Sequence, residues 1–419
     1  MTSALNAAQK QAQIAGYLIL NIVSGTVGGA MQIVVPLYAL SLHAALSQVG
    51  LIRGVSGIGT LLLVIPVGFL VDLFGSKRLF LVGAVAGTIA TYLLSYSKVP
   101  VDIALIMGIA GLFGSLKMNS LNASFFSNLQ SMGIEKAGWF KGSMSIGLTF
   151  LGPVLGAYLI HALDYPHVFK LLALLTLVPI ALVFIFHKEP TRTASSVPFK
   201  EAMSIQLADF KRLIGWRVLY LPLLTESLST AFFATFSAFV IILAVQSLHL
   251  AVSRASLLLT IEGGVFIVTV FAASSLIRIL SVLQLYAFSV AVVVGGLIYL
   301  SVAGTFAALA VSTVILGFGL GLLNLVVSSW IGRIEGEKGK IVGLFSAAVS
   351  VGASIGPMVG GLIGSRFGTR VIFLSFIPIF IGLVAAAKWL QFGDRLSPAQ
   401  HESGEEIVYE AEKEIASIV

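Results

Sequence analysis

Twelve runs of roughly 20 or more predominantly apolar residues follow one another along the chain, separated by short polar segments. A helix of about 20 residues crosses a bilayer and satisfies its own backbone hydrogen bonds, whereas the strands of a membrane barrel are only about 10 residues long. The runs therefore predict an all-α membrane protein with twelve transmembrane helices. They cover residues 14–40, 47–72, 78–97, 101–126, 139–161, 167–187, 217–245, 253–277, 281–302, 305–331, 341–364 and 369–391.

The composition excludes a soluble fold. Hydrophobic residues make up 58% of the chain and charged residues only 10%, whereas a soluble domain has about a quarter charged residues. The chain has no cysteine, which excludes disulfides, thiolate metal sites and iron–sulfur clusters. We expect a multi-pass protein of the cell membrane, with the bacterial inner membrane as its location.

Lysine and arginine are distributed unevenly between the two sides of the membrane. With a cytoplasmic N-terminus, the external loops hold five of the 25 basic residues, the spans hold two, and the cytoplasmic loops and tails hold the other 18. An excess of Lys and Arg marks cytoplasmic loops, so both termini are predicted to be cytoplasmic. This orientation explains the net charge of +7, and no aromatic-interleaved basic patch for nucleic acid is present.

One short motif occurs twice in the chain, as Gly152-Pro153-Val154-Leu155-Gly156 and as Gly356-Pro357-Met358-Val359-Gly360. The spacing, 356 − 152 = 204 residues, is nearly half of the 419-residue chain and indicates an internal duplication. We expect two six-helix bundles related by pseudo-two-fold symmetry. The predicted boundaries are 1–186 for the first bundle, 187–216 for a cytoplasmic linker, 217–391 for the second bundle and 392–419 for an acidic cytoplasmic tail.

Two polar segments carry a helical pattern of their own. In the linker, apolar residues recur at helical spacing from Phe199 to Ile214, which predicts a helix either on the inner membrane surface or packed under the bundle. In the tail, Ser403 and Glu406 have the spacing of a capping box, which leaves both a short helix and a disordered tail open.

The loop between the second and third spans reads Gly68-Phe69-Leu70-Val71-Asp72-Leu73-Phe74-Gly75-Ser76-Lys77-Arg78 and resembles the signature loop of the major facilitator superfamily. Two basic positions of that signature are replaced here, by Leu73 and Ser76. The resemblance implies a six-plus-six secondary transporter without a cofactor, in which spans one, four, seven and ten line a central cavity. The expected conformational-switch residues are Gly68, Asp72, Gly75, Lys77 and Arg78. Asp72 would meet the positive N-terminal end of span eleven and hold the inner side closed.

The repeated Gly-Pro motif also resembles a pattern of the superfamily's antiporters, which usually carry it in span five. Its fuller copy lies here in span eleven. Proline bends a helix and glycines one turn apart permit close helix approach, so we expect a seam between the halves, with ordinary helix packing as the alternative. The seam residues are Gly152, Pro153, Gly156, Gly352, Gly356, Pro357 and Gly360.

Four ionisable residues fall inside predicted spans, and each costs roughly 2.5 to 3.5 kcal/mol at mid-bilayer. The two cations, Arg53 and Lys117, belong to the first half and the two acids, Glu226 and Glu262, to the second. One explanation is a pair of salt bridges across the interface that form in one conformation only. In the other, the cations hold an anionic group of a substrate while an acid carries a proton.

Glu226 is the expected main proton carrier and Glu262 the second. Glu226 lies about nine residues from the inner end of its span, where desolvation favours a neutral carboxyl group that exchanges protons with both sides. The expected substrate cavity combines the two cations with polar residues on helical stripes of spans one and ten, which alternatively serve tight packing. Its residues are Asn21, Gln32, Arg53, Lys117 and Asn324. An outer structural ion pair remains an alternative for Arg53.

No phosphate-binding loop, metal-ligand spacing or nucleophile–base set is visible, so we expect neither an enzyme nor a metal site. The function that fits is proton-coupled export of a small organic molecule by alternating access, with a monomer as the expected state and membrane lipid, protons and the substrate as partners. Span one lacks the acidic residue frequent in multidrug exporters of the superfamily, which favours an anionic, zwitterionic or neutral amphipathic substrate. The alternatives are a proton symporter importing an organic anion and a non-transporting receptor or scaffold.

Overall fold

All regular elements in the described part of the chain are helices. The computed structural model describes residues 2–64, 66–132, 136–186, 201, 204, 208, 211–213, 215–273, 281–334 and 338–389. Within these ranges twelve helical segments are long and apolar enough to cross a membrane, each near a predicted run. The protein is therefore a multi-pass membrane protein, as the apolar runs predicted.

Six of the spans make up the first half. Its helices are α1 (Thr2–Ser41), α2 (Leu46–Val64), α3 (Val67–Phe74), α4 (Ser76–Leu93), η1 (Leu94–Tyr96), α5 (Pro100–Met132), α6 (Lys136–Ser145), η2 (Ile146–Leu151), α7 (Gly152–Ala162) and α8 (Tyr165–Phe186).

The second half supplies the other six spans. Its helices are α10 (Arg217–Ile242), η3 (Leu243–Ser247), α11 (Val252–Ala272), α13 (Val282–Val302), α14 (Phe306–Arg333), α15 (Lys338–Phe367), α16 (Thr369–Leu374) and α17 (Phe376–Trp389).

Equivalent helices pack in the same way in the two halves. In the first half, α1 packs against η2 and α7, and α5 packs against α2 and α4. In the second half, α10 packs against α15, and α14 packs against α11 and α13. The repeated packing confirms the predicted pair of six-helix bundles with pseudo-two-fold symmetry.

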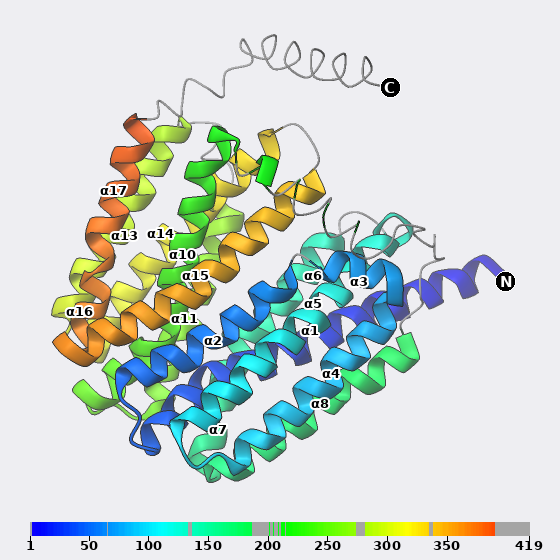
Figure 1. Ribbon diagram of the computed structural model, residues 1–419, viewed down its shortest axis with the longest axis horizontal. Coiled ribbons are helices and arrows are strands. Elements are labelled where there is room, and N and C mark those ends of the chain that lie inside the picture. The colour runs from blue at the N-terminus through cyan, green and yellow to red at the C-terminus, as the bar shows by residue number, and fades with distance from the viewer. Residues whose placement is uncertain are drawn as a thin grey trace.

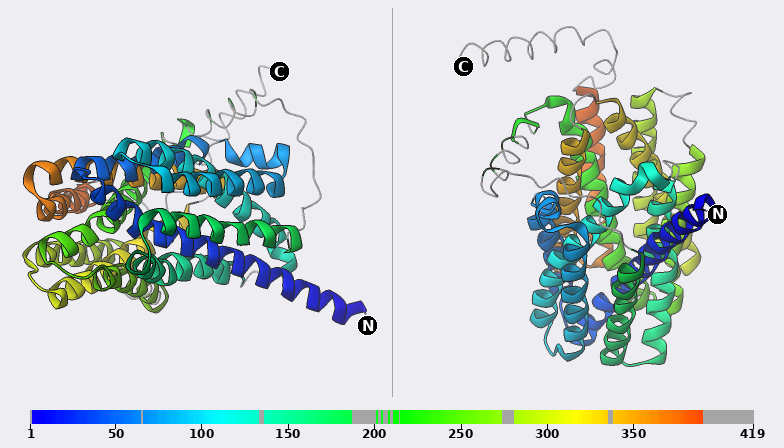
Figure 2. Two further views of the ribbon diagram at one scale, coloured as in Figure 1. Left: turned by 90° about the horizontal axis from the view of Figure 1, so that it is seen from below. Right: turned by 90° about the vertical axis from the view of Figure 1, so that its right-hand side faces the viewer.

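The most extensive contacts between the halves involve two pairs of spans. At the centre of Figure 1, α2 runs beside α15, and the second contact joins η2 and α7 to α11. We call the side of the bundle at which α1 begins the proximal side, and the opposite side, where α1 gives way to α2, the distal side. The N-terminal end of α1 projects from the proximal side (Figure 2).

Several predicted spans are interrupted. The run 47–72 is divided into α2 and α3, with Pro66 as the N-cap of α3, because proline lacks the amide hydrogen that a continuous helix needs. In span five, η2 is a turn of π-helix directly before Gly152 and Pro153. The expected linker helix at 199–214 lies largely, and the tail at 392–419 wholly, outside the described residues.

Candidate functional site

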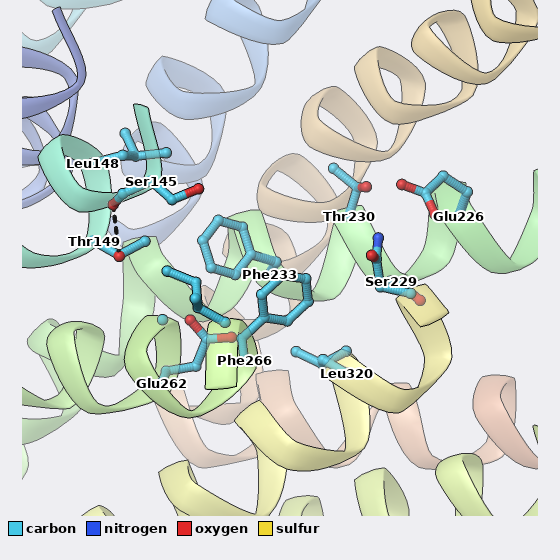
Figure 3. A pocket seen from close by; sticks show the side chains of 13 residues that line it. Ser145, Leu148, Thr149, Glu226, Ser229, Thr230, Phe233, Glu262, Phe266 and Leu320 are labelled. Atoms are coloured by element: carbon cyan, nitrogen blue, oxygen red, sulfur yellow. Dashed lines mark hydrogen bonds between the residues drawn. The ribbon is translucent and has the colours of Figure 1, made fainter. Parts of the chain in front are cut away.

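A cavity of about 220 Å³ lies between the halves and contains both membrane acids (Figure 3). Its walls come from α6 and η2 of the first half and from α10, α11 and α14 of the second. We call it the acidic cavity. Glu226 and Glu262 line it together with Thr149, Ser229 and Asn324.

Glu262 is the more deeply buried acid, with 1% of its surface exposed. Its Oε1 atom has no hydrogen-bond partner within the described part of the chain. Close packing fixes its backbone, because a Cβ added at the next residue, Gly263, would lie 2.4 Å from the Thr149 side chain across the junction. The carboxyl group is thus held at a contact between halves, with no ion-pair partner among the described residues.

Glu226 lies at the opposite end of the acidic cavity, with Phe233 and Phe266 between the two acids in Figure 3. It is half-buried, on the part of α10 closer to the proximal side. The nearby hydroxyl of Ser229 is buried and has no hydrogen-bond partner among the described residues. The cavity wall beside Glu226 therefore includes a polar group that is not satisfied by the described residues.

The two cations share a different cavity of about 270 Å³, which we call the basic cavity. All its lining residues belong to α1, α2, α4, α5 and α8 of the first half, and they include Gln32, Arg53 and Lys117. Arg53 also reaches the second half, because its Nη2 atom donates a hydrogen bond to Oγ of Ser237 on α10 at 3.4 Å. Of the five predicted cavity residues, three thus line the basic cavity and Asn324 lines the acidic cavity.

None of the four membrane charges forms an ion pair in the described part of the structure. An ion-pair contact joins Asp164, between α7 and α8, to His167 in the first turn of α8. The proposed salt bridges between halves are accordingly not formed in this arrangement. The charges lie instead in two cavities of opposite sign.

Asn21 lines neither cavity. Its side chain is fully buried, and its Nδ2 atom donates to the Phe140 carbonyl oxygen at 2.7 Å. The same stripe of α1 includes Gly25, whose backbone packs against Met144, and Gln32, which lines the basic cavity. One helical stripe therefore serves both packing and the cavity.

The signature loop makes a tight turn at Gly75. This residue has φ +85°, a conformation that favours glycine, and it ends α3 and begins α4. The Lys77 ammonium lies 5.4 Å from the centre of the Phe184 ring, and Arg78 is exposed. A Cβ at Gly68 would meet no atom within 4 Å. The Asp72 side chain lies outside what the structure describes, so its expected contact with span eleven stays a prediction.

The glycines of the Gly-Pro motifs pack mainly within their own halves. Gly152 and Gly156 lie against α1, and Gly352 and Gly356 lie against α10 at equivalent places. Gly360 faces Thr235 of α10. The contact of α15 with the first half is made by a neighbouring face, where the Pro357 carbonyl oxygen and Gly361 approach Gly50 of α2.

Several cavity residues escaped the sequence reasoning although helical spacing points to them. On α10, Ser229, Thr230 and Phe233 follow Glu226 at three, four and seven residues and line the same cavity. Ser24 follows Asn21 at three residues and lines the basic cavity. The signal that could have found them is the period of the helix that carries the charge.

Comparison with known proteins identifies the family. A sequence model described as the Major Facilitator Superfamily matches residues 17–330 and 223–417. No curated protein matches the chain in sequence. Among solved structures, a variant of the nucleoside transporter NupG is similar, with a TM-score of 0.77 and 13% identity over 89% of this chain and 98% of that one.

Two other solved structures are similar to a comparable extent. The human organic anion transporter MFSD10 (TETRAN) has a TM-score of 0.65 and 15% identity over 90% of this chain and 98% of its own. A POT family transporter in complex with 5-aminolevulinic acid has a TM-score of 0.73 and 12% identity over 93% and 96%. At these identities the likeness shows the fold alone. The family match extends across the chain, and the protein is a member of the major facilitator superfamily.

Proposed function

We propose that this protein is a proton-coupled secondary transporter that exports small organic molecules by alternating access. The observation that supports proton coupling best is the acidic cavity, where Glu226 and Glu262 lie between the halves without an ion-pair partner in the described part of the chain. A mobile interface is the place where bound protons can be exchanged between two sides.

The chemistry assigned to the two acids is reversible protonation. An isolated carboxylate is costly in an apolar surrounding, and a protein avoids that cost by holding the group neutral. Glu262, buried and with an unpartnered oxygen, would hold a proton in the arrangement seen here. Glu226, half-buried and nearer the proximal side, would exchange protons with the cytoplasm. Both carriers are those expected from the sequence.

Alternating access is supported by where the halves touch. The tight contacts lie toward the distal side, where the Ser47 amide donates to Oγ of Ser365 at 2.7 Å and Gly50 lies against Pro357. If both termini are cytoplasmic, these contacts close the external side. Separation of this seam and closure at the proximal ends would then expose the cavities to the outside.

A second candidate is a proton symporter that imports an organic anion, and the basic cavity favours it. The two modes differ in the charge moved. Exchange of one monovalent anion outward for one proton inward moves two positive charges inward, whereas symport of the same pair moves none.

Substrate-dependent proton flux tests the proposed function. Purified protein is reconstituted in liposomes that contain a pH-sensitive dye and are loaded with one compound from an anionic, zwitterionic and neutral panel, so that each compound moves outward. Proton movement opposite to the compound, increased by an inside-negative potential, is expected for an exported anion. Proton movement with the compound, independent of potential, would support the symporter. Transport of panel compounds without proton flux would overturn proton coupling in both.

A further inference from the structure

The basic cavity contains two cations and, among its described lining residues, no acidic side chain. Arg53 and Lys117 both line it, and no aspartate or glutamate is found among its described lining residues. Unpaired charges are rare inside membrane proteins and mark binding sites or ion paths. If the two side chains bind a ligand, some of their hydrogen-bond donors must be without a partner in the protein.

Most of those donors are free. A guanidinium group has five N–H donors, and the described structure gives Arg53 one acceptor, Oγ of Ser237. The ammonium group of Lys117 has three donors and no acceptor within the described ranges. An incoming anionic group would thus find two cations whose hydrogen-bonding capacity is largely unused.

A neutral donor in the same cavity is also unsatisfied. Ser24 is 6% exposed, and its hydroxyl has no hydrogen-bond partner in the part of the chain that the structure describes. Buried hydroxyl groups normally have partners, so an orphaned one beside two free cations points to a missing acceptor. The Gln32 side chain adds an amide to the same wall.

We infer that the basic cavity binds the anionic group of a small amphipathic organic molecule, with Arg53 and Lys117 as its charged ligands and Ser24 as a neutral donor. Apolar lining residues such as Val27, Met31 and Met107 offer a surface for the rest of the molecule. The inference deepens the proposed function, because it gives the transported substrate a negative charge and assigns it to the first half, apart from the acidic cavity.

Binding to the purified protein in detergent tests the inference by calorimetric titration. The probes are benzoate, benzenesulfonate and phenyl phosphate, each compared with neutral benzamide. At least one anion should bind 10-fold or more tightly than benzamide, since hydrogen bonds to charged groups contribute factors of about 10 or more. Lys117→Met should reduce that affinity about 10-fold, Lys117→Arg should retain most of it, and Ser24→Ala should cause a smaller loss.

The control is Arg254→Gln, which removes an exposed cation that lines neither cavity and should leave affinity unchanged. The melting temperature without anion gives a second readout. Lys117→Met should match or exceed the wild type, because it removes an unpaired charge, whereas a decrease would reveal a structural partner and overturn the assignment.

Other outcomes also overturn it. One is equal binding of all three anions and benzamide, and another is anion binding unaffected by Lys117→Met. Displacement of the bound anion by phosphatidylglycerol would assign the cavity to a lipid headgroup instead. The titrations need no proton gradient, so a failure of proton coupling leaves their result intact.

Discussion

Arg53 and Ser237 link the two halves of the protein through a hydrogen bond from Nη2 to Oγ at 3.4 Å. Arg53 lines the basic cavity of the first half, while Ser237 lies on α10, the helix that carries Glu226. A ligand that recruits the guanidinium group would compete with this bond. The pair therefore offers a physical connection between events in the basic cavity and the position of α10.

Ser237→Ala should shift the balance between conformations. The substitution removes one bond that favours the arrangement seen here, which at this length is expected to contribute about 0.5 to 1.5 kcal/mol and to change the population ratio about 2- to 10-fold. Because the chain has no cysteine, spin labels at Leu73→Cys and Val342→Cys can report the distance between the proximal ends of the halves.

For this measurement, both labelled positions are exposed in the structure. A matched control is Ser375→Ala, whose hydroxyl bonds to the Ile372 carbonyl within its own segment. If the two alanine variants gave the same distance distribution, the Arg53–Ser237 bond would have no part in the equilibrium.

Gly50→Ala should disturb the distal seam. A Cβ at this position would lie 2.2 Å from the Pro357 carbonyl oxygen, a backbone atom of the other half. Such overpacking costs about 1 to 3 kcal/mol, so the variant should open the seam and increase labelling of a cysteine at Ser47. Gly295→Ala, where no atom lies within 4 Å of the added Cβ, should leave the labelling rate unchanged. Equal rates in the two variants would contradict a close seam at Gly50.

The contact between Asp164 and His167 on the distal surface should make a pH-dependent contribution to the stability of the folded state. The hydrogen bond from His167 holds the pKa of the Asp164 carboxyl below its usual range. A lowered carboxyl pKa stabilises the folded state above the ordinary value of about 3.9, and this contribution is lost as the pH falls through the lower, folded value. Wild type should therefore melt slightly above Asp164→Asn near neutral pH, and the difference should vanish in strong acid.

A double-mutant cycle checks the origin of that difference. In a His167→Gln background, Asp164→Asn should no longer produce the same pH-dependent change in melting temperature. A change of the same size in both backgrounds would show that Asp164 acts through another partner.

The sequence predicts the spans well because each apolar run must satisfy its backbone within one helix. It predicts helix rotation poorly, since helices that are apolar on most sides carry little information about which face meets a neighbour. Asn21 and Gln32 lie on one predicted stripe, yet the first packs against Phe140 and the second lines the basic cavity. The sequence shows that the membrane charges of the first half are basic and those of the second half acidic. Their division between two cavities depends on side-chain packing, which the sequence does not reveal.

The copy of the Gly-Pro motif in span five illustrates a similar limit. Gly147 and Gly152 are five residues apart, whereas Gly352 and Gly356 are four apart. The π-turn of η2 accommodates the additional residue, so that both Gly147 and Gly152 contact α1 around Thr26. The π-turn thus compensates for the offset of one residue between the two motif copies. Only the contacts show that the glycines of the two copies occupy equivalent positions.

Proton coupling through the acidic cavity is the central claim, and transport by carboxamide variants tests it most directly. Wild type, Glu262→Gln and Glu226→Gln are reconstituted in parallel, with Ser375→Ala as a control. The substrate is a compound that causes proton flux through the wild type in the liposome assay described above. Each protein is assayed for exchange of labelled for unlabelled substrate without a pH gradient, and for substrate accumulation driven by a pH gradient. We predict that each glutamine variant retains exchange and loses gradient-driven accumulation with its proton flux. Accumulation and proton flux at wild-type rates in both glutamine variants would contradict the account.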